Sequence, residues 1–289
     1  MAAKIEKMQT LTQARGYLTA HQGVTAPLPL LGGPIQVSIS QTVGGVFVAL
    51  PDHRRLDPQV FGPRELPRHY AGTPIITGVP VPLRVEAPGG GMQTKVLTPF
   101  GDKHIVMGEG KLHIDAVDAT ATDAATTQDS VQMNASWKDK DGNTYFVKCC
   151  AKMAAHGVES PTFGGVATNI ILHGFTGLGT PLMPSEFTQF AFWGMGAVGM
   201  NGKVLDEPRL IHGMLTEYVR KAGYKLDFDS EVTPTRTQFH LMVPPMKPDP
   251  AHGIFTHAPV HTGLKLPNGM TLPFWHVMFE SLEVNSHRS

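Results

Sequence analysis

Cysteine is nearly absent from this chain. Its 289 residues include only two cysteines, Cys149 and Cys150, and the two are adjacent. Neighbouring cysteines rarely pair with each other because the disulfide strains the peptide between them. On a strand, their side chains would also point to opposite faces. We therefore expect two reduced thiols in a cytoplasmic protein, with a vicinal redox pair as the alternative.

Charge is also scarce, and neither sign is in excess. Charged residues make up 17% of the chain, and Lys and Arg balance Asp and Glu at 24 each. A nucleic-acid binder neutralises phosphates and normally carries a basic excess or a basic stripe. The strongest basic spot here is the pair Arg54 and Arg55, so we expect no nucleic-acid partner.

Long apolar runs are missing as well. No stretch reaches the roughly 18 uninterrupted apolar residues of a membrane-spanning helix. Residues 1–18 have no apolar segment behind a basic start, so they do not resemble a secretory signal. We therefore expect no membrane partner. The longest apolar run, Phe190 to Met200, is interrupted by glycine and tryptophan, and is a candidate subunit contact in a homo-oligomer.

Glycine and proline are abundant, at 31 and 24 residues. Proline ends helices and central strands, and glycine supplies the positive φ angles of tight turns. With many short β-type runs, this composition predicts a mainly β fold, either an antiparallel barrel or a sandwich, with an N-terminal helix and one or two short helices. We expect one large β-rich domain over residues 1–289, with a sub-boundary near residues 88–92 left open.

Several segments support this fold class. An alternating run over residues 130–137, the dipeptide Asp141-Gly142 and a second run over residues 144–148 predict a β-hairpin. The helices are expected over residues 4–21 and 185–193, whereas residues 210–219 fit either a helix or a strand. Further strands are expected over residues 35–39, 46–50, 75–79, 111–118, 224–228, 237–243, 260–266 and 274–284.

The last third of the chain repeats a short pattern, His-x-Met. It occurs at His212–Met214, His240–Met242 and His276–Met278. Residues two apart on a strand share a face, so each pair would present an imidazole and a thioether together. The residues between and beside them are mostly apolar. These strands are therefore expected to be apolar on one face and His/Met on the other, either lining a cavity or buried on both sides.

A carboxylate joins this pattern at Glu280, which shares a face with His276 in a strand and also in a helix. Imidazole with carboxylate is the ligand set of many zinc and non-haem iron sites. We therefore predict a divalent metal, zinc or iron, and Cu(I) is a variant because thioethers bind it. The predicted metal ligands are His173, His212, His240, His276 and Glu280, of which His240, His276 and Glu280 are also the predicted catalytic residues. The predicted substrate-binding residues are Met214, Met242, Met278, Trp193 and Trp275.

Three functions remain open at this stage. The first is a metal-dependent enzyme of hydrolase or lyase type, acting on a small and largely apolar organic substrate in a His/Met-lined β-cavity. The second is a metal-free protein that binds a small hydrophobic ligand in the same cavity. The third is a structural or assembly protein.

Overall fold

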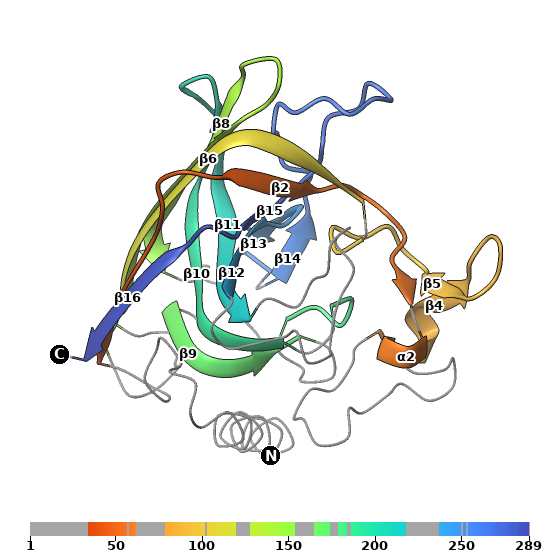
Figure 1. The fold of residues 1–289 in the computed structure, drawn as a ribbon, viewed down its shortest axis with the longest axis horizontal. Coiled ribbons are helices and arrows are strands. Elements are labelled where there is room, and N and C mark those ends of the chain that lie inside the picture. Colours follow the sequence, from red (N-terminus) through yellow and green to blue (C-terminus); the bar gives the residue numbers. More distant parts are fainter. Residues whose placement is uncertain are drawn as a thin grey trace.

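A closed, eight-stranded antiparallel barrel is the centre of the molecule (Figure 1). The computed structural model describes residues 34–56, 58–61, 79–101, 103–119, 128–153, 165–173, 179–183, 186–217, 237–249, 251–252 and 254–288. The strands follow one another around the wall in the order β6 (His104–Asp118), β2 (Gly45–Ala49), β15 (Trp275–Phe279), β12 (Thr237–Val243), β11 (Lys203–Glu217), β10 (Glu186–Met200), β8 (Thr144–Met153) and β7 (Ser130–Lys138), and the pairing of β7 with β6 closes the ring.

Two long strands, β6 and β10, each pair with two different strands along one edge. The first part of β6 pairs with β2, and its second part pairs with β1 (Ile35–Gln41), which in turn pairs with β16 (Glu283–Arg288). Likewise, one end of β10 pairs with β8 and the other end with β9 (Gly165–Leu172). In Figure 1, β16 and β9 extend the wall at the lower end of the barrel.

Smaller elements surround the barrel. In Figure 1, a three-stranded sheet lies to its right. This sheet consists of β3 (Arg55–Leu56), β5 (Met92–Thr94) and β4 (Arg84–Glu86), and next to it are the four-residue helix α2 (Pro58–Phe61) and the 3₁₀ turn η1 (Val81–Leu83). The remaining strands, β13 (Met246–Asp249) and β14 (Ile254–His257), form a separate pair. Among the described residues, no helix has the length and apolarity needed to cross a membrane.

The barrel interior is filled by side chains. Each of the eight strands places alternate apolar residues in one continuous buried cluster, as expected for strands whose side chains alternate between two faces. Trp137 of β7 and Trp275 of β15 lie on strands that are not neighbours, yet their ring centroids are only 4.9 Å apart. Tyr145 of β8 also contacts Trp275, at 5.4 Å. These rings meet across the interior, so the barrel encloses a packed core.

Much of this architecture matches the sequence predictions. The mainly β fold is confirmed, and of the two alternatives the structure has the barrel. The hairpin is confirmed: β7 and β8 are antiparallel, with Lys138 opposite Thr144 across the turn. Strands are also found over the predicted segments at residues 35–39, 46–50, 111–118 and 237–243, with small differences at their ends.

The short helix over residues 185–193 is wrong, because that segment is the start of β10. Ser185 followed by Glu186 resembled a helix start, but the segment pairs with β9 on one side and β11 on the other. Two-sided pairing and the burial of alternate side chains, including Phe190 and Phe192, outweigh a local capping signal. The ambiguous stretch from residue 210 is the end of strand β11. The N-terminal helix over residues 4–21 lies outside the described residues.

Two C-terminal predictions also need correction. Residues 260–266 do not form a regular strand: they have an isolated bridge between Lys265 and Thr271 and a few backbone hydrogen bonds to residues 270–273. Residues 274–284 contain two strands, β15 and the start of β16, with Glu280 to Leu282 between them.

The sub-boundary near residues 88–92 falls on the turn between β4 and β5, where Ala87 and Gly91 are hydrogen-bonded. The expected strand over residues 224–228 is outside the described residues, as are residues 75–78 of the expected strand over 75–79; Val79 is described and is not in a strand.

The prediction of two reduced thiols differs from the structure, in which Cys149 and Cys150 form a disulfide with each other. Gly196 of β10 lies opposite Cys149, but its neighbour Met195 lies opposite Lys152, so β8 has a bulge at this position. A bulge interrupts the alternation of side chains along a strand. The argument that adjacent cysteines point to opposite faces therefore fails locally.

Candidate functional site

The three His-x-Met pairs lie on adjacent strands, β11, β12 and β15. Because neighbouring strands run in opposite directions, each histidine lies opposite a methionine of the next strand. The pairs in register are His212 with Met242, Met214 with His240, His240 with Met278 and Met242 with His276. The sheet therefore carries an alternating pattern of imidazoles and thioethers on one face, which we call the His/Met face.

The His/Met face is on the outside of the barrel wall. On β12, the alternate residues Phe239, Leu241 and Val243 belong to the interior core. His240 and Met242 therefore point the other way. Both are nonetheless buried, at 1% and 8% exposed. The strands are thus buried on both faces, and further segments of the chain must cover the outer one.

A cavity of about 270 Å³ lies against the His/Met face. Its wall on the barrel side comes from β10, β11, β12 and β15. Its cover comes from segments outside the barrel, around Pro99, Thr180 and Pro245. The lining residues are Pro99, Phe100, Leu172, His173, Gly179, Thr180, Met183, Trp193, Leu210, His212, Met214, His240, Met242, Pro244, Pro245, Met246 and His276.

Among the described residues, the lining carries no formally charged side chain. Apart from four imidazoles, one threonine hydroxyl and the indole N–H of Trp193, its side chains are apolar. Such a pocket, mostly apolar with a few polar groups that fix orientation, is typical of small-molecule sites. Its volume lies just below the roughly 300–1,000 Å³ of pockets for drug-sized ligands, which indicates a smaller occupant.

His212 presents an acceptor to this cavity. Its Nδ1–H donates to the backbone carbonyl of Phe192 at 2.9 Å, so in the neutral ring Nε2 carries the lone pair. Nε2 is buried and has no hydrogen-bond partner among the described residues. The ring is held by stacking on Trp193, with centroids 4.5 Å apart and planes at 14°. Burial lowers the pKa of His212 to about 4, so the imidazole is neutral at pH 7.

His173 lies beside His212, with ring centroids 6.2 Å apart. Its Nε2 is 3.1 Å from the thioether sulfur of Met214. Burial, and secondarily the proximity of His212, lowers the pKa of His173 to about 3. The backbone of His173 has a left-handed φ of 65°, and its ring packs against Gly179. A Cβ at residue 179 would lie 2.6 Å from His173 Nδ1, so this close approach requires glycine.

His240 and His276 form a directed hydrogen-bond chain. His276 Nδ1–H donates to the carbonyl of Pro99 at 2.7 Å, which leaves its Nε2 as an acceptor when the ring is neutral. His240 Nδ1–H then donates to His276 Nε2 at 2.9 Å. The backbone carbonyl thereby fixes the tautomers of both rings, and the lone pair of neutral His240 is on Nε2.

Seven of the predicted site residues line this one cavity, and three do not. Those that line it are His173, His212, His240, His276, Met214, Met242 and Trp193. Trp275 belongs to the other face of β15 and is packed in the barrel interior. Met278 is buried against Ala49 and Phe47. Glu280 accepts a hydrogen bond from Gln238 at 2.7 Å and is not part of the lining.

The cover of the cavity was missed by the sequence reasoning. Pro99, Phe100 and Met183 lie far from the His-x-Met pairs in sequence, and no local pattern indicates that they fold over them. Pro244 and Pro245 directly follow β12, which is a weak signal that the chain turns there. Long-range packing is what brings these segments to the His/Met face.

The predicted zinc or iron site lacks a matching donor set in the part of the chain that the structure describes. No group of three or more His, Cys, Asp or Glu is placed there to hold a metal ion. Glu280, the predicted carboxylate ligand, is absent from the cavity wall. The donors that do converge in the cavity are imidazoles and thioethers.

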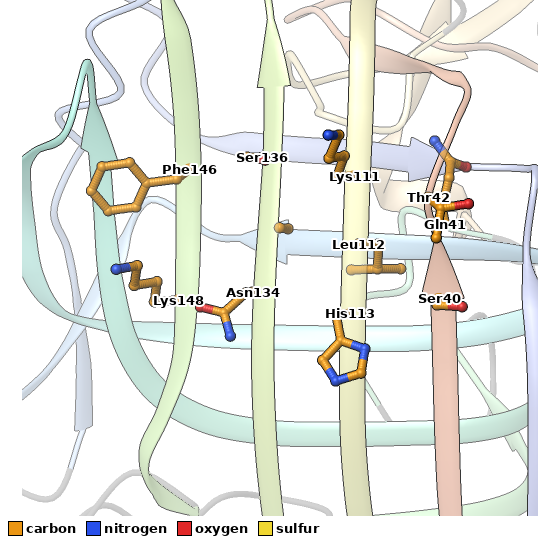
Figure 2. Close-up of a pocket in the computed structure, with 11 residues that line it drawn as sticks. Ser40, Gln41, Thr42, Lys111, Leu112, His113, Asn134, Ser136, Phe146 and Lys148 are labelled. Atoms are coloured by element: carbon orange, nitrogen blue, oxygen red, sulfur yellow. The ribbon is translucent and has the colours of Figure 1, made fainter.

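Other hollows and polar pairs lie on the surface. A groove of about 470 Å³ lies over β1, β6, β7 and β8. Figure 2 shows Lys111 and His113 on β6 and Lys148 on β8, with β7 between the two strands. His113 bonds to Asp115 at 2.8 Å, and both side chains are more than half exposed. His252 and His261 are exposed as well. These groups form solvated surfaces, unlike the buried imidazoles of the cavity.

Comparison with known proteins gives no relative from which a function could be transferred. No protein-family model, no curated protein and no solved structure matches the chain.

Proposed function

We propose that the chain binds a small, uncharged and largely apolar molecule in the cavity on the His/Met face, and that a hydrogen-bond donor on this molecule bonds to His212 Nε2. The observation that carries this proposal is a buried acceptor that has no hydrogen-bond partner in the described part of the chain and faces a largely apolar pocket. Leaving such a group unsatisfied costs about 1–3 kcal/mol, which a ligand with an O–H or N–H group would recover.

The uncharged character of the lining, as far as the structure describes it, indicates the class of ligand. A carboxylate or ammonium group would lose its hydration in this cavity without meeting an opposite charge, which is costly. Apolar walls contributed by Phe100, Met214 and Met242 favour an aromatic or aliphatic body. Phenol combines these properties, with one ring and one donor.

Isothermal titration calorimetry with phenol, toluene and benzoate tests the proposal. Phenol should bind more tightly than toluene by about 3- to 10-fold, the effect of one neutral hydrogen bond, and benzoate should not bind. His212→Phe keeps an aromatic ring beside Trp193 but removes the acceptor, so the preference for phenol should disappear. Met278→Leu is the matched control, because Met278 is buried outside the cavity. Equal binding of phenol and toluene to the unaltered chain, or no binding of either, would contradict the proposal.

A hydrolase is a second candidate function, and the hydrogen-bond chain from Pro99 through His276 to His240 favours it. An oriented neutral imidazole can act as a general base on water. p-Nitrophenyl acetate is a suitable probe because its hydrolysis is visible at low rates. Hydrolysis that is lost in His240→Gln and kept in Met278→Leu would support an enzyme, and equal rates in the two variants would exclude this role for His240.

A further inference from the structure

The donor atoms around His173 differ from those of a zinc or iron site. They are imidazole nitrogens and thioether sulfurs, and the lining residues that the structure describes include no carboxylate. Soft thioether ligands select Cu(I), whereas carboxylate and water oxygens suit harder cations. We propose that His173, His212 and Met214 together bind one Cu(I) ion in the cavity.

The first argument is the contact between His173 and Met214. Nε2 and the sulfur atom are 3.1 Å apart. Two donors of one ion are separated by roughly 3–4 Å, because each metal–ligand bond is about 2.0–2.3 Å long. The two side chains are therefore already at the spacing of a ligand pair. Binding of the ion through Nε2 requires the tautomer of His173 that carries its proton on Nδ1.

The second argument is independent and concerns His212. It lies two residues before Met214 on the same face of β11, and its ring contacts that of His173. Its Nδ1–H donates to a backbone carbonyl, as metal-binding histidines almost always do with their second nitrogen. Its Nε2 is buried and has no partner among the described residues, so it can accept an ion without losing another bond.

The third argument is charge. A buried cation costs solvation energy that rises steeply with its charge, and no carboxylate offsets it among the lining residues of the described ranges. Neutral ligands in such a pocket therefore favour a monovalent ion over a divalent one.

This inference goes beyond the proposed function, because a metal ion and phenol are different occupants of the same cavity. Both would use the lone pair of His212 Nε2, so Cu(I) should inhibit phenol binding. The two proposals can fail separately: calorimetry with phenol is done on the metal-free chain, and metal binding is measured without any organic ligand.

The test is a titration of the full chain with Cu(I) under anaerobic conditions, with bicinchoninate as the coloured competitor. One equivalent of Cu(I) should be retained, and Zn(II) should bind much more weakly. Met214→Leu should weaken Cu(I) binding by at least about 10-fold, whereas Met278→Leu should leave it unchanged. Exchange of Met for Leu conserves volume and is usually tolerated in a core, so both variants should fold.

X-ray absorption at the copper edge of the unaltered chain gives a readout that does not depend on the variants. One sulfur and two nitrogen scatterers are expected. The proposal is overturned if the chain retains no Cu(I), if Met214→Leu binds it as tightly as Met278→Leu does, or if no sulfur is bound to the copper.

Discussion

The two faces of strands β11, β12 and β15 show how one sheet separates stability from chemistry. Facing inward, Phe239, Leu241 and Trp275 fill the barrel together with residues from all its strands. Facing outward, the histidines and methionines line a cavity beneath other segments of the chain. Both faces are buried, yet the histidines of these strands and the cavity are found on the outer one. The comparison shows that burial alone does not identify a core. The types of side chain on each face identify it.

The largest effect on stability is expected when a large side chain on the inward face is truncated. Trp275→Ala should lower the free energy of unfolding by about 3–5 kcal/mol, because it opens a void where Trp137 and Tyr145 now pack. Trp193→Ala is the matched change on the outer face and should cost less, since Trp193 already borders a cavity and is partly exposed. Urea unfolding followed by circular dichroism measures both. Equal losses would mean that the two faces contribute alike.

The second-largest effect is expected from acid, which should lower the free energy of unfolding through two histidines of the cavity. The pKa values of His173 and His212 lie at about 3 and about 4 in the folded chain, against 6.5 in the unfolded one. The unfolded state therefore binds more protons, and stability falls as the pH drops below about 6.5. Between pH 7.5 and 5.5 the two histidines together should cost about 2–3 kcal/mol. Urea unfolding at the two pH values should show this loss, and most of it should vanish when both residues are replaced by Phe.

The smallest of the three effects concerns a glycine on the inward face. A Cβ at Gly213 would lie 2.3 Å from Phe192 Cε1 and 2.6 Å from Phe239 Cζ. Gly213→Ala should therefore destabilise the chain by about 1–3 kcal/mol through overpacking. Gly45→Ala is the control, because there the nearest atom would be at an ordinary 3.4 Å. Thermal unfolding compares the two, and a tolerated Gly213→Ala would show that the interior has spare room.

The sequence predicted which side chains share a face but not what covers them. A period of two along the chain is a local property, so alternation placed His240 with Met242 and opposite to Leu241. The register between strands and the segments that cover the His/Met face are not local properties of the sequence. The pairing of β12 with β11 and β15, and the approach of Phe100 and Met183, depend on segments distant in sequence. The sequence reasoning therefore recovered the mainly β fold, with the barrel as one of two alternatives, and all four cavity histidines, but it missed the residues that cover the cavity.

The predictions that were wrong for individual residues also have specific structural explanations. Trp275 alternates with His276 and so belongs to the interior, which the period of two already implies. Glu280 follows the last residue of β15, and there it bonds to Gln238. The vicinal cysteines lie at a bulge, where the period of two does not apply.

The arrangement of aromatic rings has a practical consequence for spectroscopy. The chain has three tryptophans, and two of them, Trp137 and Trp275, are sealed inside the barrel. The third, Trp193, is stacked on His212 at the cavity. Emission from the first two should follow the integrity of the fold, while emission from Trp193 should respond to whatever occupies the cavity. The chain thus contains its own optical probe of occupancy, and the Trp193→Phe variant supplies the blank.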